Sequence, residues 1–214
     1  GYKPSQGLLP AGGVFPFSPT LDQVGTVARA VGDVARFTAP LAEGDAIPAA
    51  PGLPASAPVL GVLADLPWTH LEPEAREHFD ALERRLIGLG AHTRDIVLSP
   101  AFGDANLVHR TIMLHEAARQ HGALQAENRR RLSIALNDGL DEGRRIAPAT
   151  YGEMLARRAA LIERSEDLFE DCDVIITPAT AGGAPRRLDT TGDPGFCTLW
   201  SLVGFPALTL PMGL

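Results

Sequence analysis

Lysine is almost missing from this sequence. Of 214 residues, 19 are basic, and Lys3 is the single lysine among them. The 26 acidic residues bring the net charge to −7, so the chain lacks the positive field with which most nucleic-acid-binding proteins attract phosphate. We therefore expect no nucleic-acid partner. The one dense basic run, residues 129–131, is interpreted as a solvated helix face beside Glu127.

Cysteine is nearly as scarce, and long apolar runs are lacking. Cys172 and Cys197 cannot build a disulfide framework, and no CxxC motif or Cys/His cluster with zinc-ligand spacing occurs. No window of 18 apolar residues exists, and the first residues form no apolar signal core. We expect a cytoplasmic protein without a membrane span and without a metal site.

Glycine and proline, in contrast, are plentiful, at 22 and 18 residues. They have no collagen-like period and indicate many tight loops. Residues 1–20 and 39–58 are so densely punctuated that we predict loops for both. Apolar residues make up 45% of the chain, enough for a packed core.

Short apolar runs alternate with helical stripes along the rest of the chain, which predicts the α/β class. Strands are expected at 59–63, 94–98, 173–177 and 207–210, all in one sheet. Helices are expected at 26–38, 74–89, 104–121, 123–137, 149–171 and 196–203. Pro73 favours a helix start, and Phe79, Leu82, Leu86 and Leu89 form one apolar stripe, each side chain worth about 1.5–3 kcal/mol when buried. The strands on either side of this helix are expected to pair in parallel through a right-handed crossover.

Motifs for common catalytic chemistry are absent. The sequence contains no GxSxG elbow, no P-loop, no GxGxxG and no HExxH. A polar cluster of Asp189, Thr190, Thr191 and Asp193 lies in a Gly/Pro-rich loop, and a turn or capping role is the favoured interpretation. Composition and spacing alone lead no further than an α/β domain.

Several segments, taken in order, resemble the amidase signature family. The opening GYKPSQG is similar to the family's GxK-P-T/S-x-G run, and residues 18–29, SPTLDQVGTVAR, to its S-x-S/T-L-D-x-x-G-x-x-A-R segment. Met113, Glu116 and Ala117 match its M…EA helix. Further matches are Arg131-Leu132, Tyr151, Arg157-Arg158, the run 173–180 (DVIITPAT), and the close 204–213 (GFPALTLPMG). Each motif is weak alone, but their order spans nearly the whole chain.

The resemblance implies an α/β/α architecture around a mixed β-sheet and an amide-hydrolysing activity that needs no cofactor. The family's triad is a nucleophilic serine, a bridging serine on a cis peptide bond, and a lysine, with an oxyanion loop rich in Gly and Ser. In the family, that loop and the catalytic lysine both precede the GxKPT run. We therefore expect residues 1–214 to be the C-terminal portion of a single amidase domain, with no catalytic residue of its own. Lys3 is expected to be a structural lysine, and Ser5 is not the nucleophile.

The resemblance also suggests which residues line the acyl pocket of the substrate. These are Arg131, Asp193, Phe196, Cys197 and Trp200. Ordinary core packing is the alternative for Phe196 and Trp200, a small buried apolar role for Cys197, and a surface ion pair for Arg131.

The function that follows is part of an amidase acting on a small-molecule carboxylic amide. The alternative is a catalytically inactive amidase-like protein for binding or assembly, and a homodimer is compatible with either. A transamidating protein working on charged tRNA is a third possibility, but it would need partner chains, and this acidic chain offers no basic face. The segment upstream of Gly1 in the gene would decide between the first two.

Overall fold

The computed structural model describes residues 1–42, 56–187 and 190–211. Most of the expected connection 39–58 lies outside these residues, as do Asp189 of the polar cluster and the last motif residues, Met212 and Gly213. The described strands are β1 (Tyr2–Lys3), β2 (Val59–Val62), β3 (His92–Asp95), β4 (Val174–Ile176) and β5 (Ala207–Leu208). The described α-helices are α1 (Val31–Thr38), α2 (Pro73–Gly88), α3 (Ala105–Asn128), α4 (Ile134–Arg145), α5 (Pro148–Glu166) and α6 (Gly195–Val203). Short 3₁₀ turns lie at η1 (Ala39–Leu41), η2 (Pro100–Phe102), η3 (Arg129–Arg131) and η4 (Asp167–Phe169).

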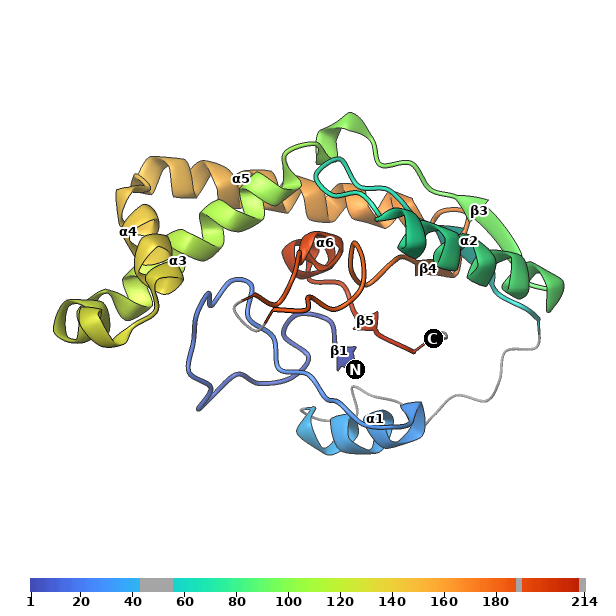
Figure 1. Ribbon diagram of the computed structural model, residues 1–214, viewed down its shortest axis with the longest axis horizontal. Helices are drawn as coiled ribbons and strands as arrows, with labels where there is room; N and C mark the ends of the chain where they lie inside the picture. Colours follow the sequence, from blue (N-terminus) through green and yellow to red (C-terminus); the bar gives the residue numbers. More distant parts are fainter. Residues whose placement is uncertain (43–55, 188–189, 212–214) are drawn as a thin grey trace.

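The α/β class is confirmed, with a three-stranded parallel sheet beside α2 in the right-hand part of the molecule (Figure 1). β2 is the middle strand and pairs in parallel with β3 on one side and β4 on the other. Gly61 lets the side chains of Ile96 and Cys172 pack directly against the backbone of β2, because a Cβ at this position would lie 2.3 Å from Ile96 Cδ1 and 2.8 Å from Cys172 Sγ. The glycine inside the predicted strand thus has a packing reason. β4 is an edge strand of this sheet, so Val174 is half exposed rather than buried as expected.

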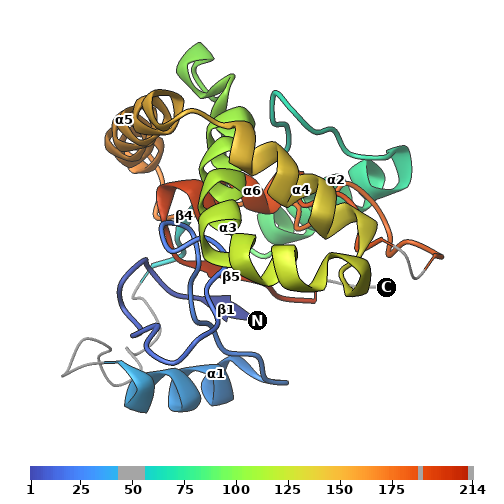
Figure 2. The ribbon, with the colours of Figure 1, turned by 90° about the vertical axis from the view of Figure 1, so that its left-hand side faces the viewer.

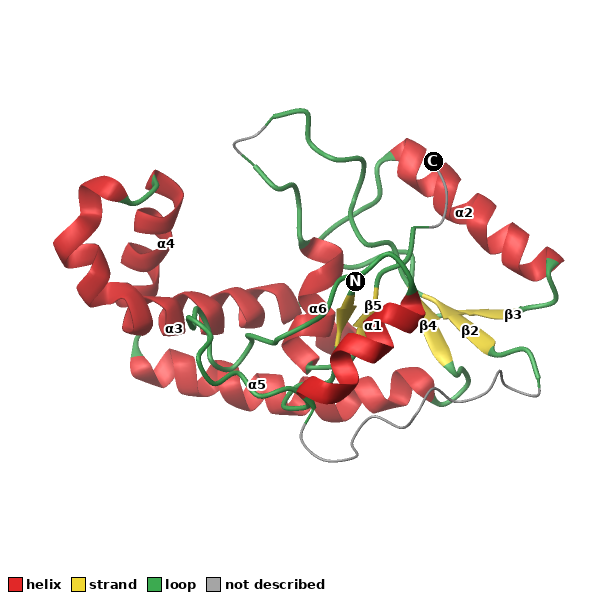
Figure 3. Ribbon diagram, turned by 90° about the horizontal axis from the view of Figure 1, so that it is seen from below, coloured by secondary structure: helices red, strands yellow, loops and turns green. Residues whose placement is uncertain are grey.

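The expectation of one sheet for all four predicted strands is wrong at its last strand. β5 pairs with β1 in a separate antiparallel sheet, in the register Tyr2 to Leu208 and Lys3 to Ala207. Residues 1–20 are therefore not loop throughout, since β1 joins the two ends of the described chain. The two sheets lie next to each other, with β5 nearer to β4 than to β3 (Figures 1 and 3).

Helix α1 begins later than predicted. Thr26, expected at the start of a helix, exchanges two backbone hydrogen bonds with Tyr2, at 2.8 and 2.9 Å. This pairing keeps residue 26 extended, so the helix begins only at Val31. The crossover helix α2 begins at Pro73 as predicted and buries Phe79, but Leu89 lies past its end and is 76% exposed, so the stripe is only partly buried.

Helix α3 is one continuous helix where two were predicted. The cost of one glycine in a helix is only about 0.5–1 kcal/mol, and α3 packs against α4, α5 and α6, so the helix continues through Gly122 to Asn128. The chain then turns through η3, and the Ser133 hydroxyl accepts the Leu136 N–H at 3.2 Å to begin α4. Figure 2 shows α4 lying beside the second half of α3. Pro148 begins α5, which ends at Glu166, before the predicted 171.

The main core lies where α3, α5 and α6 meet. Leu199, Leu202, Ile112 and Val108 have no exposed surface at the centre of this cluster. Gly204 ends α6 with a φ of 75°, a left-handed conformation that glycine adopts without strain. Among the described helices, none is long and apolar enough to span a bilayer.

Candidate functional site

A cavity of about 360 Å³ lies between β1, residues 25–27, the start of α6 and β5. Its accessible lining is mostly apolar. The polar and aromatic side chains on its wall are Tyr2, Lys3, Thr26, Cys197, Trp200, Ser201 and Thr209. Apolar pockets with a few placed polar groups are typical of small-molecule sites, so this cavity is the candidate site.

Lys3 stands in the wall of this cavity, half-buried, and all its hydrogen-bond acceptors are neutral. Its ammonium donates to Gln23 Oε1 at 2.9 Å, to the Pro4 carbonyl at 3.4 Å, and to the Phe205 carbonyl. Burial lowers the pKa of Lys3 to about 8. These contacts join β1 to segment 17–27 and to the residues just before β5, and none of them is to a serine, in keeping with the structural role expected for this lysine.

The start of α6 is fixed by Asp193. Its Oδ1 accepts the Gly195 N–H at 2.9 Å, and its Oδ2 accepts the Thr69 hydroxyl at 2.6 Å. Trp68 Nε1 also donates to the Gly195 carbonyl at 3.0 Å. A Cβ at Gly195 would lie 2.7 Å from Thr69, so the helix and segment 68–69 approach as closely as glycine allows. Both carboxylate oxygens of Asp193 thus accept hydrogen bonds that set the position of α6.

The structure brings two of the five expected pocket residues to the cavity. Cys197 and Trp200 lie on its wall. Phe196 does not line the cavity and is 1% exposed in the core. Asp193 precedes the helix without lining the cavity. Trp200 belongs to both settings, because it lines the cavity and is only 8% exposed within the core cluster.

Cys197 is not a poised nucleophile. The residue is exposed, in contrast to the small buried role given as its alternative, and partial desolvation of its thiol raises its pKa, which disfavours the thiolate. The Sγ lies 3.4 Å from the Ala179 carbonyl, which it contacts as a donor. The residue therefore contributes surface and a weak donor to the cavity wall.

Arg131 lies away from the cavity. It is exposed in η3, between α3 and α4, at the left end of the molecule in Figure 1, whereas α6 is at the centre. In the same turn, Arg129 forms an ion pair with Asp141. Arg131 lines neither of the two cavities described here.

A second cavity of about 440 Å³ lies at the end of β3 and the start of β4. Its charged wall includes Arg94, Asp95, Asp167, Glu170 and Asp171. The Arg94 guanidinium reaches Asp171 at 3.4 Å on the exposed surface. Across the described ranges, no group of three or more His, Cys, Asp or Glu side chains is arranged to hold a metal ion.

Sequence reasoning missed the opposite wall of the first cavity. Tyr2, Thr26 and Thr209 line it, but a two-residue strand paired across more than 200 residues leaves no local pattern. The one available signal was the KPS run at residues 3–5. Its Lys3 lies in β1, which pairs with β5 near the other end of the described chain, and lines the cavity.

The fold is that of an α/β domain with a candidate site in its cavity, and comparisons with known proteins make the class specific. A solved structure described as the crystal structure of an amidase superposes on 96% of this chain with a TM-score of 0.81 and 28% identity, and the match covers 49% of that chain. The family model named Amidase matches residues 1–214. The chain belongs to the amidase signature family, whose members are hydrolases acting on amides.

Curated relatives are similar over the whole chain. A 2-amino-5-chloromuconic acid deaminase from Comamonas testosteroni is 27% identical over 100% of this chain and 49% of its own length. One polypeptide of the glutamyl-tRNA(Gln) amidotransferase of Cutibacterium acnes is 26% identical over 100% of this chain and 52% of its own length. The chain thus spans about half the length of the curated relatives it matches.

Proposed function

We propose that this chain forms the scaffold and one wall of the acyl pocket of an amidase that hydrolyses a small-molecule carboxylic amide. The observation that carries the proposal is the cavity between α6 and β1, lined by Cys197 and Trp200 within a chain of the amidase signature family. The nucleophile, the bridging serine and the lysine base would be supplied outside residues 1–214.

Three of the seven serines of this chain make structural contacts, which supports placing the nucleophile elsewhere. The hydroxyl of Ser18 donates to Glu116 at 2.6 Å, and that of Ser165 donates to the Leu161 carbonyl at 2.7 Å. Ser133 caps α4. The Lys3 ammonium donates to two carbonyls and one amide oxygen, contacts that suit a structural lysine.

In this assignment, the chain contributes orientation rather than proton transfer. Trp200 would present an apolar surface to the acyl group, and the Asp193–Thr69 contact would hold α6 so that this surface keeps its place. A fixed pocket wall raises the rate by keeping the bound amide in a reactive orientation, while the bond-breaking step belongs to groups outside this chain.

The test is Trp200→Ala in the complete amidase domain. Removing the indole enlarges the pocket, so kcat/KM for a bulky aryl amide should rise relative to that for a small aliphatic amide by about tenfold or more, since each methylene-sized change in an apolar pocket is worth about 1–3 kcal/mol. The matched control is Leu199→Ala, on the same helix but fully buried away from the cavity. It should lower the Tm and leave the ratio unchanged.

An equal loss for all amides in Trp200→Ala, together with a lower Tm, would show that Trp200 is a core residue only. A complete domain that hydrolyses none of a broad amide panel would instead favour the inactive protein for binding or assembly.

A further inference from the structure

One buried carboxylate gathers three of the separate motifs of this chain. Glu116, in the middle of α3, is 7% exposed. Its Oε2 accepts the Ser18 hydroxyl at 2.6 Å and the Thr20 N–H at 3.0 Å. Its Oε1 accepts the Tyr151 hydroxyl at 2.6 Å and also the Thr20 hydroxyl. The S-x-T segment, the M…EA helix and the tyrosine of α5 are therefore parts of one hydrogen-bond network.

Hydrogen bonds from neutral donors stabilise the negative charge of the Glu116 carboxylate. Burial alone would raise the pKa of Glu116, but the hydrogen bonds from Ser18, Thr20 and Tyr151 outweigh it and hold the pKa below its ordinary value. Arg158 of α5 acts on Glu116 only at longer range, because its guanidinium donates to the Leu202 carbonyl at 2.7 Å and to Gln6. A carboxylate held by four donors fixes their positions closely.

The segment held by Glu116 continues directly into the cavity wall. Asp22 accepts the backbone N–H groups of Phe17 and Ser18 at 2.7 and 3.0 Å, which closes the turn. Gln23 then accepts the Lys3 ammonium, and Thr26 pairs with Tyr2. Residues 25–27 line the cavity opposite α6.

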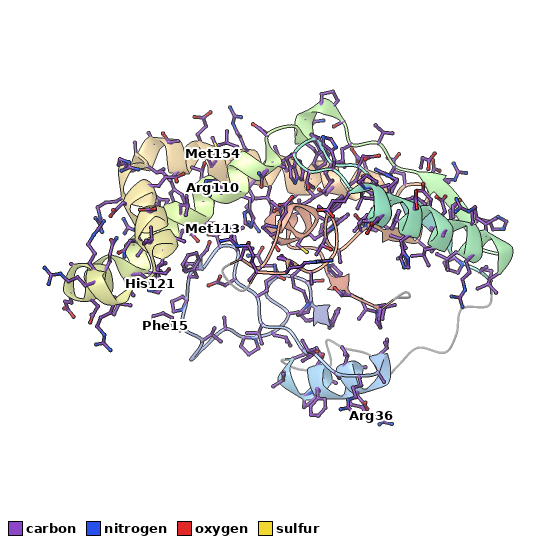
Figure 4. The ribbon with its side chains drawn as sticks, viewed as in Figure 1. Phe15, Arg36, Arg110, Met113, His121 and Met154 are labelled. Carbon is purple, nitrogen blue, oxygen red and sulfur yellow. The ribbon has the colours of Figure 1, made fainter. Side chains whose placement is uncertain are left out.

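A second contact holds the beginning of the same segment. Phe15 and Phe17 pack on the His121 ring of α3, with centroid distances of 4.8 and 5.7 Å (Figure 4). Residues 15–20 thus follow α3 from His121 to Glu116. Between Thr20 and the bridge at Thr26, the segment is also held by Lys3 at Gln23, by Gln6 Nε2, which donates to the Thr20 carbonyl at 2.7 Å, and by Leu21, which is buried in the main core.

We propose that Glu116 is a positioning residue of the acyl pocket: by holding Ser18 and Thr20 against α3, it places the 25–27 wall at a fixed distance from Cys197 and Trp200. The inference rests on the proposed function only in naming the cavity an acyl pocket. The mechanical link from Glu116 to the wall is a property of this chain and is measurable without catalysis.

The experiment compares removing the donors of the segment with removing the donor of α5. Ser18→Ala/Thr20→Val deletes two hydroxyl donors of the segment and leaves α3 and α5 unchanged. Tyr151→Phe deletes one donor from α5 and keeps the ring that stacks on His115 at 4.3 Å. Both sets are made in a Trp68→Phe background, so that Trp200 is the only tryptophan, and they are compared with Trp68→Phe alone, because this substitution itself removes the hydrogen bond to the Gly195 carbonyl.

Two readouts report on the wall. In the double variant, amide hydrogen exchange at Tyr2 and Thr26 should become about tenfold faster, with Val108 and Ile112 in α3 unchanged, because local opening needs less free energy than global unfolding. Acrylamide quenching of Trp200 fluorescence should rise in parallel. Tyr151→Phe should leave both readouts at the reference level, even where it lowers the Tm. If the double variant does not fold, Ser18→Ala alone carries the same expectation with a smaller change.

Uniformly faster exchange throughout the chain in the double variant would make Glu116 an ordinary stabilising residue and overturn the proposal. Unchanged exchange at Tyr2 and Thr26 would overturn it as well. In the complete domain, a positioning role predicts that KM rises more than kcat falls. Failure of the exchange test leaves the amidase assignment standing, whereas failure of the Trp200 selectivity test leaves the Glu116 link standing.

Discussion

Two charged side chains, Glu116 and Lys3, hold segment 17–27 through hydrogen bonds to its neutral groups. Glu116 accepts hydrogen bonds from two hydroxyl-bearing residues of the segment, and Lys3 donates one to Gln23 in the same segment. Charge-assisted hydrogen bonds are stronger than neutral ones and impose geometry at the same time. Both residues occur in motifs that the sequence presents as separate, and their shared segment explains why these motifs belong together.

Acid should weaken the network before it unfolds the chain. The folded-state pKa of Glu116 lies below its ordinary value of 4.5, so its contribution is complete above about pH 4.5 and is lost as the pH falls through the folded pKa. The free energy of unfolding of the native chain minus that of Glu116→Gln should therefore be largest at pH 7 and shrink below pH 4.5. Urea unfolding at pH 7, 5 and 3.5 measures this difference.

The groups that face this carboxyl are Ser18, Thr20, Tyr151 and, at longer range, Arg158, with His115 stacked on the tyrosine. A difference that stays constant from pH 7 to 3.5 would contradict the account, since it would mean that the carboxyl has the same pKa in the folded and unfolded chain.

At the scale of elements, α3 and α4 pack so closely that one position tolerates only glycine. A Cβ on Gly143 would lie 1.9 Å from the Leu114 carbonyl oxygen and 2.5 Å from its carbon. Because these are backbone atoms, they cannot move aside without separating the helices. Gly143→Ala should therefore lower the free energy of unfolding by about 1–3 kcal/mol or more, as overpacked cores do.

Gly152→Ala in α5 is the matched control. Gly152 is exposed, and no atom crowds its Cβ position, so the substitution should stabilise the chain by about 0.5–1 kcal/mol through helix propensity alone. Urea unfolding of both variants gives the comparison. A Gly143→Ala chain as stable as Gly152→Ala would mean that α3 and α4 are further apart than described.

Local signals predicted the existence of most elements but not all of their limits or partners. Pro73 and the Phe79 stripe were sufficient for α2, because both act within one helix. Gly122 was misleading: one glycine costs a helix only about 0.5–1 kcal/mol relative to alanine, and α3, which packs against α4 and α5, passes through it. The late start of α1 was hidden in the sequence, because Thr26 is kept extended by Tyr2, a partner outside its own segment.

At the scale of the whole molecule, the chain presents apolar side chains on several elements at once. Val27 and Val97 are each 87% exposed, and Phe37 on α1 is 64% exposed. Relatives that match this chain are about twice as long. A domain completed by further polypeptide would cover such positions, which agrees with a chain that supplies only part of a pocket.

The candidate site was predictable on one wall only. Residues 195–203 form the expected helix, and Cys197 and Trp200 reach the cavity from it. The other wall depends on pairing between β1, Thr26 and β5, which no local pattern records. Arg131 was expected near the substrate and stands in η3, apart from the cavity, so its place in a substrate site stays a prediction for the complete domain.

The central claim is that this chain builds a pocket wall while the nucleophile lies outside it. The most direct measurement is labelling of the purified 214-residue chain with a fluorophosphonate probe, alongside hydrolysis of a panel of amides and esters and a known serine hydrolase as positive control. The account predicts no labelling and no turnover above background, since nucleophile, relay, base and oxyanion donors act as one unit and Lys3 is engaged by Gln23, Pro4 and Phe205. Stoichiometric labelling that maps to one of the seven serines of this chain would contradict it.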